Sequence, residues 1–473
     1  MIWEAPLAGK HCKRSPIQTE VAKRGGTGLA AAALTVTGLS TAVVTGTTAA
    51  VAPNVQLMAL VSAANSTSQF FAGSSYYGQD WTEIYGGQQV VPFFQGPQGI
   101  ADAITNVAFE DDSTGVTGSG WGAGQAGTAL GIIAANDAAN PPGEDDVLPT
   151  IGLVILDNNT NRAGGGFWTT YPQFAPLLLT TADPTPNNLD VTVLDIAYEY
   201  NINSDAPVDP LNPFALGNSL AAYAFGYGAE SRTLNITQDE AGATPVYTEP
   251  DGTEVPLQPG YHYVVDSDGF IASEDKLPVN PDGSSVTTTY ITVDSGNLPL
   301  TRPLRLIPGG DILANAIDPL MTDLVNAGYN DGLGQEDNPA IPENPTVTRP
   351  WQPFSSLSAL DAGDLQDDVE DGATAGATTA FENIGNPSNF ITKPIGEIGQ
   401  LPFLSTLTNS SVTQTGLTTN KAASAPQTAA TGSNSERPRP LKKAADDFNS
   451  SLKKFAESLH KKAPASSEND NEG

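Results

Sequence analysis

The chain has 473 residues, enough for one large domain or two of ordinary size, and it carries one cysteine and three histidines. A single cysteine excludes a disulfide framework and a cysteine-based zinc site, and so few histidines exclude a histidine-rich centre, so we expect no metal and no cofactor. The 21 basic and 53 acidic residues give a formal net charge of −32. Such a protein repels nucleic acid, whose binding needs basic side chains to replace phosphate counterions, so nucleic-acid function is excluded.

The first predicted segment is residues 1–52. Residues 1–26 are basic, and residues 27–52 carry no charge and end in small residues, Ala50 and Ala52, that suit a signal peptidase. This pattern predicts a signal peptide, and therefore a secreted protein or a protein of the cell envelope. The uncharged run is also long enough to span a membrane, so a retained amino-terminal anchor is the alternative.

Residues 53–335 contain the predicted globular domain. Short apolar runs that suit strands alternate with runs rich in Ala and Leu that suit helices. Residues 150–156 (TIGLVIL) form a continuous apolar run, as expected for a strand that is covered on both faces. The alternation predicts an α/β fold of the α/β-hydrolase kind, with a mostly parallel sheet and helices on both of its faces.

Within this domain, residues 234–289 have a different pattern of short β-rich pieces. They are separated by three Asp-Gly pairs that begin at Asp251, Asp268 and Asp282, and each pair suits a hairpin turn because Gly accepts a positive φ. We interpret the segment as a β-hairpin insertion. A cap over the carboxyl edge of the sheet and plain decoration are both open.

The carboxyl-terminal third lacks the pattern of a second core. Residues 336–435 are first rich in proline, then acidic, then rich in Ser and Thr, which predicts a largely disordered linker. In the tail, residues 436–473, apolar residues recur at steps of three and four between 441 and 459, with six lysines on the remaining surface. We expect segment 441–462 to contact an anionic membrane peripherally, to dock on an acidic surface such as the protein's own, or to remain solvated.

Four segments, in order, resemble the PE-PPE domain, a mycobacterial α/β serine-hydrolase family. Residues 161–166 (NRAGGG) are similar to its NR…GG loop, and residues 199–228 are similar to its YDGxxDxPxxPLNP stretch. Residues 297–305 resemble its NLPLLxPLR element, and residues 318–329 resemble its closing helix. The resemblance implies an exported actinobacterial envelope protein on a hydrolase scaffold. Family members act as esterases, lipases or acyltransferases on envelope lipids.

The positions that match the family's catalytic residues are replaced. The GxSxG nucleophile elbow corresponds to residues 118–124 (GSGWGAG), where two registers place the nucleophile at Gly120 or at Gly122. The family aspartate corresponds to Asn201, although Asp205 retains a second acidic position, and the family histidine corresponds to Tyr227.

These replacements predict a catalytically degenerate scaffold that binds an envelope lipid or a protein partner. A serine hydroxyl needs a base within hydrogen-bond reach, and a tyrosine with a pKa of about 10 replaces imidazole poorly. Two alternatives remain open. One is an active serine esterase, lipase or acyltransferase that uses Ser119, Asp205 and His262, and the other is a surface structural or adhesion protein.

Overall fold

The computed structural model describes residues 59–64, 76–108, 113–141, 146–178, 180–226, 234–331, 338–360 and 362–399. The predicted signal segment 1–52 and the basic tail 436–473 lie outside these residues. Among the helices described, none is both long enough and apolar enough to cross a bilayer.

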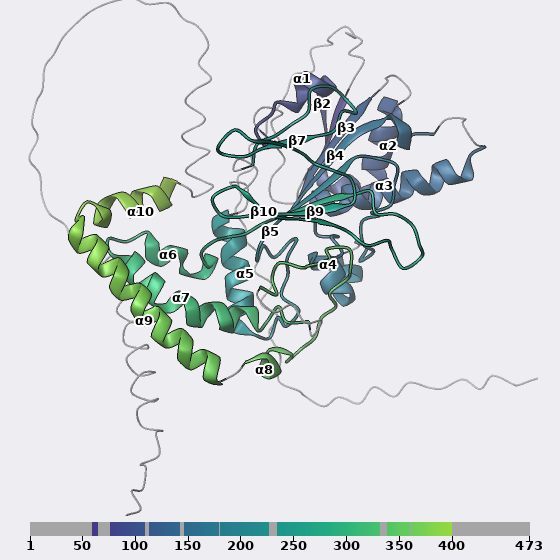
Figure 1. Cartoon of the computed structure of the whole chain (residues 1–473). Helices are drawn as coiled ribbons and strands as arrows, with labels where there is room; N and C mark the ends of the chain where they lie inside the picture. Colours follow the sequence, from purple (N-terminus) through teal and green to yellow (C-terminus); the bar gives the residue numbers. More distant parts are fainter. Residues whose placement is uncertain are drawn as a thin grey trace, which may run out of the picture. The chain divides into compact units, whose positions relative to one another are not determined.

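An eight-stranded sheet forms the centre of the domain, with strand order β10-β9-β11-β5-β4-β3-β1-β2 (Figure 1). Every neighbouring pair is parallel except β10 and β9, which are antiparallel. The strands are β1 Ala59–Ala63, β2 Gly87–Val91, β3 Thr114–Ser119, β4 Ile151–Asp157, β5 Val193–Tyr198, β9 Tyr261–Val265, β10 Ile271–Lys276 and β11 Thr289–Val293. The predicted α/β class with a mostly parallel sheet is confirmed.

Both faces of the sheet are buried, which explains the continuous apolar run of β4. Leu153 and Ile155 pack into the apolar cluster on one face, and Val154 and Leu156 pack into the cluster on the other face. Helices α2 (Gly96–Ala108) and α3 (Trp121–Ala139) cover this second face and contribute Ile104 and Leu130 among others.

The first face is covered by α1 (Trp81–Tyr85) and a small antiparallel sheet of β6 (Ile236–Thr237), β7 (Val246–Thr248) and β8 (Glu254–Pro256). Ile236 and Tyr247 share an apolar cluster with Ile155 of β4. The predicted β insertion is therefore divided, because β9 and β10 extend the main sheet while β6 to β8 cover its face. This arrangement differs from a cap over the carboxyl edge, since the apolar side chains are buried against the face.

Helices that follow β4, β5 and β11 gather on one side of the domain (Figure 1). They are α4 Phe167–Thr170, α5 Pro213–Gly226, α6 Arg302–Arg305, α7 Gly310–Asn326, α8 Ser356–Ala359, α9 Ala362–Gly385 and α10 Asn389–Gly399. Short 3-10 turns are η1 Phe93–Gln95, η2 Leu148–Thr150, η3 Pro172–Leu178 and η5 Pro299–Thr301.

The described part of segment 336–435 differs from the predicted disordered linker, because α9 packs along α7. The two backbones approach so closely that a Cβ added at Gly372 would lie 2.2 Å from the carbonyl oxygen of Ala316, and one at Gly376 would lie 2.7 Å from the Ala316 Cβ. Small residues rather than large apolar ones form this contact, so a search for hydrophobic periodicity misses it. Residues 400–435 lie outside the described part of the chain.

Two glycines of α3 provide a matched test of the packing between this helix and the sheet. A Cβ at Gly122 would lie 2.5 Å from the carbonyl oxygen of Ala63, whereas at Gly131 the nearest atom, in Pro186, would be 3.5 Å away. We expect Gly122→Ala to lower the free energy of unfolding by about 1–3 kcal/mol through overpacking. Gly131→Ala should raise it by about 0.5–1 kcal/mol because glycine weakens a helix interior. Urea denaturation of both variants measures the difference, and equal effects would contradict the packing described.

Candidate functional site

The turn between β3 and α3 is formed by one residue, Gly120, with φ 53° and ψ −122°. Its N–H donates to the carbonyl oxygen of Asp157 (2.8 Å), and its carbonyl oxygen accepts from the N–H of Gly124 (3.1 Å). A sharp strand-to-helix turn with one residue in a strained conformation is the geometry of a nucleophile elbow. The backbone thus distinguishes the two registers, because Gly120 occupies the tip of the elbow and Gly122 lies in the first turn of α3.

The glycines on either side of the tip permit the close approach that the turn requires. A Cβ at Gly118 would lie 2.9 Å from the Cα of Ala123, and Gly122 lies against the end of β1. The scaffold therefore retains the shape of the elbow, while the residue at its tip has no side chain that could attack a substrate.

The elbow lies where the strand order changes direction. Strand β1 pairs with β2 on one side and with β3 on the other, and the sheet continues through β4 and β5 on the side of β3. Open α/β sheets bind their ligands at the carboxyl ends of the strands at such a switch point. Gly120 directly follows the carboxyl end of β3, so the elbow occupies this position.

Ser119, the last residue of β3, is only 2% exposed and is paired in register with Asp157 of β4. Its hydroxyl bonds to the Asp157 carboxylate, which also accepts from the hydroxyl of Tyr77 (2.7 Å) and the amide of Asn158 (3.0 Å). Burial raises the pKa of Asp157 to about 6, although these hydrogen bonds act against the shift. Ser119 is therefore held in a buried polar cluster.

His262 lies on β9, on the far side of β4, β5 and β11 from Ser119. Four strand spacings separate the two strands by roughly 19 Å. The Nε2 atom of His262 is 2.9 Å from Oγ1 of Thr292. Burial, and then the positive charge of Arg162, lower the pKa of His262 to about 3. The structure does not bring Ser119 and His262 together.

Asn201 and Asp205, which stand at the family's acidic positions, make hydrogen bonds and an ion pair with nearby groups. Oδ1 of Asn201 accepts the N–H of Asn203 (3.1 Å), while Oδ2 of Asp205 accepts the N–H of Tyr200 (2.6 Å) and its Oδ1 lies 3.4 Å from Nη1 of Arg349. Burial raises the pKa of Asp205 to about 7, and Arg349 opposes this shift. Tyr227 lies outside the described residues.

An aromatic cluster lies beside the elbow. The ring of Trp121, the residue after the tip, packs against Phe93 (centroids 4.8 Å apart) and Trp168 (5.1 Å). Both indole Nε1 atoms are buried, and neither has a hydrogen-bond acceptor among the described residues. These two N–H groups are donors set among aromatic rings beside the elbow. In the described part of the chain, no three His, Cys, Asp or Glu side chains are grouped to hold a metal ion.

Comparison with known proteins agrees with this geometry. Residues 91–255 and 261–330 match the model of the PE-PPE domain. The chain belongs to the PE-PPE domain family.

Two relatives come from Mycobacterium tuberculosis. The uncharacterized PPE family protein PPE42 (strain CDC 1551 / Oshkosh) is 30% identical over 248 residues, which cover 52% of this chain and 33% of the relative. The uncharacterized PPE family protein PPE28 (strain ATCC 25618 / H37Rv) is 30% identical over 246 residues, 51% of this chain and 30% of the relative. The matched region thus spans about a third of each relative. No solved structure matches the chain significantly.

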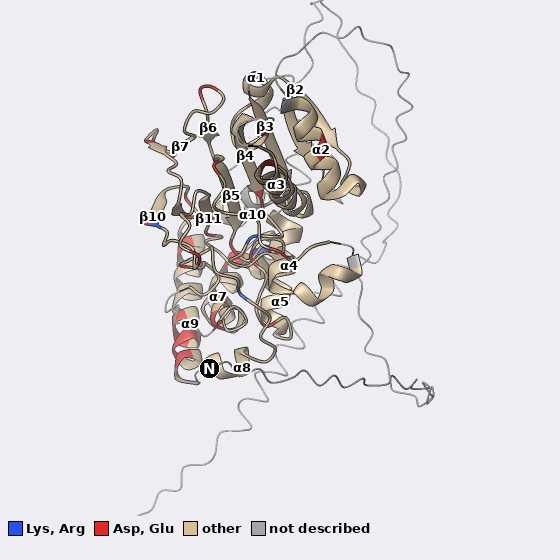
Figure 2. Cartoon of the chain, turned by 90° about the vertical axis from the view of Figure 1, so that its right-hand side faces the viewer, with Lys and Arg blue, Asp and Glu red and all other residues tan. Residues whose placement is uncertain are grey.

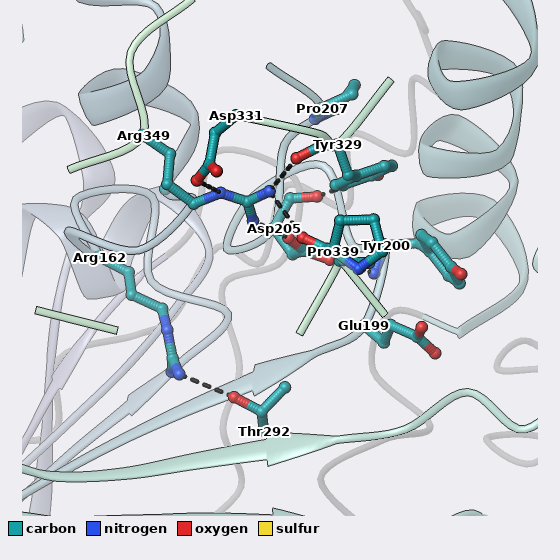
Figure 3. A network of polar contacts seen from close by, with 12 residues as sticks. Arg162, Glu199, Tyr200, Asp205, Pro207, Thr292, Tyr329, Asp331, Pro339 and Arg349 are labelled. Atoms are coloured by element: carbon teal, nitrogen blue, oxygen red, sulfur yellow. Dashed lines mark hydrogen bonds and ion pairs between the residues drawn. The ribbon is translucent and has the colours of Figure 1, made fainter. Parts of the chain in front are cut away.

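In this PE-PPE domain, Arg162 of the NRAGGG loop is buried under the loop. It donates to the carboxylate (2.9 Å) and carbonyl oxygen (2.8 Å) of Asp195 on β5. It also donates to the hydroxyl of Thr292 on β11 (2.9 Å) (Figure 3). The ion pair fastens the loop that follows β4 to the next two strands.

Arg349 lies next to Asp205 of the candidate site, and the sequence did not predict this position. It comes from the proline-rich segment and is 2% exposed. It donates to the carbonyl oxygens of Tyr329 (2.5 Å) and Pro339 (2.7 Å), and its Nε lies 3.3 Å from the Asp331 carboxylate (Figure 3). Its other carboxylate partner, Asp205, is 144 positions away in the sequence. No local pattern signals a pairing over that separation.

Glu199, at the carboxyl end of β5, is a further buried carboxylate. Oε2 accepts the N–H (2.8 Å) and the hydroxyl (2.6 Å) of Ser295, and Oε1 accepts the amide of Asn338 (2.7 Å). Burial, and then the charge of Asp294, raise the pKa of Glu199 to about 7.

Replacing Arg349 should show how much its ion pairs contribute to the free energy of unfolding. We expect Arg349→Met to lower the free energy of unfolding by about 3–5 kcal/mol, because it leaves buried carboxylates without a cation. Lys393→Met is the control, because Lys393 is 38% exposed in its pair with Asp311, and it should cost about 1 kcal/mol or less. Guanidinium denaturation measures both, and similar losses would refute a structural role for Arg349.

The raised pKa of Glu199 predicts a pH dependence of stability. Its folded-state pKa of about 7 exceeds the ordinary value of 4.5, so the folded protein binds the proton more tightly. The resulting stabilisation is complete below pH 4.5 and is lost as the pH rises through 7, on the order of 3 kcal/mol in total. Glu199→Gln should remove this component, so the difference in unfolding free energy between wild type and variant should change with pH. Parallel profiles would contradict the assignment.

Proposed function

We propose that this PE-PPE domain is a catalytically degenerate hydrolase scaffold in an exported protein of the cell envelope. It binds an envelope lipid ester without cleaving it. The observation that carries the proposal is Gly120, which has the backbone conformation of an elbow nucleophile and no side chain.

The surroundings of the elbow support the absence of catalysis. The hydroxyl of Ser119, one residue from the tip, is bonded to the buried Asp157, and His262 lies on β9, four strand spacings from β3. A serine hydrolase that lacks both its nucleophile and its base loses most of a roughly million-fold rate enhancement. What remains is a site that can position a ligand.

The position and chemistry of the site support binding. The elbow lies at the switch point of the sheet, and beside it the half-buried Trp121 and the buried Trp168 hold two N–H donors that lack an acceptor among the described residues. A lipid ester combines an apolar chain with a carbonyl oxygen that can accept such a bond. The predicted secretory segment 1–52 supports export to the envelope.

A single titration separates binding from hydrolysis. With p-nitrophenyl hexanoate, we expect saturable quenching of tryptophan fluorescence and no release of nitrophenol above the buffer rate. Trp121→Phe should remove most of the quenching, because Trp121 follows the elbow tip, whereas Trp351→Phe is the control that should retain it. A fluorophosphonate probe should not label the protein.

Two outcomes would overturn the proposal. One is nitrophenol release, or fluorophosphonate labelling, that persists through purification and disappears in Ser119→Ala. The other is an absence of saturable quenching in the wild-type protein.

A further inference from the structure

Helix α9 has an inner face that packs on α7 and an outer face that does not. On the inner face Thr379 accepts a hydrogen bond from the amide of Asn315 (2.7 Å), and the amide of Asn383 donates to both carboxylate oxygens of Asp311 (3.1 and 3.0 Å). These contacts fix the rotation of the helix about its axis, and therefore determine which residues face outward.

The outer face carries an apolar stripe. Val369, Phe381 and Ile384 are 54%, 75% and 69% exposed, and the exposed Ala373 and Ala377 lie between them. With 3.6 residues per turn, positions 369, 373, 377, 381 and 384 fall in one sector of about 120°, which also contains the exposed Glu370. A helix with an exposed apolar side next to its packed side has the form of an element that receives a partner helix.

The same helix is strongly acidic. Its 24 residues include six acidic and no basic side chains (Figure 2). Asp367 falls on the flank of the stripe, and Asp371 and Asp364 lie further around the helix, between the stripe and the packed face. Burial, and then a hydrogen bond and charge repulsion from Asp323 of α7, raise the pKa of Asp368 to about 6, with Asp371 and Asp364 acting in the same direction. The carboxylates near the start of the helix are therefore crowded, and the helix itself carries no cation, although Glu382 near its end lies 3.8 Å from Nζ of Lys393 in α10.

We propose that the outer face of α9 is a docking surface for a lysine-rich amphipathic helix. The apolar side of that helix covers the stripe from Val369 to Ile384, and its lysines lie against the acidic flank. Charge selects this occupant. A second copy of α9 would bring like charges together, and an anionic lipid surface would be repelled by the same carboxylates.

The protein's own sequence contains a segment of the required chemistry, which provides the probe. Residues 441–462 combine an apolar residue at every third or fourth position with six lysines, and they lie outside the described residues. A synthetic, fluorescein-labelled peptide of this sequence is titrated with the full-length chain. The chain carries Phe448→Gln, Leu452→Gln and Phe455→Gln, so that its own copy of the segment does not compete.

Fluorescence anisotropy should show saturable binding that weakens with added salt. Removal of the stripe by Val369→Gln with Phe381→Gln should weaken the affinity at least about tenfold, since each buried apolar side chain contributes to binding. Val279→Gln, at a side chain that is 64% exposed in the loop after β10, is the control and should have no effect. Because all these side chains are exposed, circular dichroism should report an unchanged fold.

A second pair of variants tests the charge. Asp367→Asn, Glu370→Gln and Asp371→Asn together should weaken binding about fivefold at low salt. Glu240→Gln, Glu254→Gln and Asp268→Asn remove the same charge from exposed positions in the β insertion and should leave the affinity unchanged. The proposal is overturned if the peptide does not bind, or if both sets of variants weaken peptide binding equally. It is also overturned if the wild-type chain binds anionic vesicles and the α9 variants abolish that binding.

Discussion

The packing of α3 against the carboxyl ends of β1 and β3 is the constraint on which the site depends. It requires a turn of one residue at positive φ, and the turn at Gly120 meets this requirement without strain because glycine has no Cβ. Gly118 and Gly122 let the helix approach the strands. Serine at the tip would carry a strained backbone, which hydrolases accept because the residue is their nucleophile. With glycine at the tip, the turn has this geometry without a nucleophilic side chain.

Two buried arginines connect parts of the domain that are distant in the sequence. Arg162 joins the loop after β4 to β5 and β11, and Arg349 joins the proline-rich segment to the loop after β5. Because an unpaired buried charge is strongly unfavourable, each arginine restricts its loop to conformations that keep the carboxylate partner. Residues 338–353 are thus part of the domain, held by Arg349, by the bond from Asn338 to Glu199 and by backbone hydrogen bonds such as that from Trp351 to Thr170, although their composition is that of a linker.

The carboxylates near the ends of β4 and β5 are held in hydrogen-bond networks inside the domain. Asp157, Glu199 and Asp205 each accept hydrogen bonds from neighbouring backbone or side-chain groups, and burial raises the pKa of each. Their proton affinity follows from burial within the scaffold, so it appears in the pH dependence of stability. The carboxylates of helix α9, by contrast, are crowded on the surface of the domain, where a cationic partner can reach them.

The sequence by itself determined the α/β class, the order of the apolar strands, the glycines around the elbow and the lack of a serine in either register. These features are local, since burial on both faces of a strand and the replacement of one residue appear in neighbouring positions. Only the tertiary structure decided that Gly120 occupies the tip, that Ser119 is held by Asp157 and that His262 lies several strands away. It also decided that a helix built on Gly372 and Gly376 packs on α7, and that Arg349 reaches Asp205. Such contacts depend on the order of the strands in the sheet and on how closely two backbones pack. Both bring together residues that are far apart in the sequence, so no local spacing predicts them.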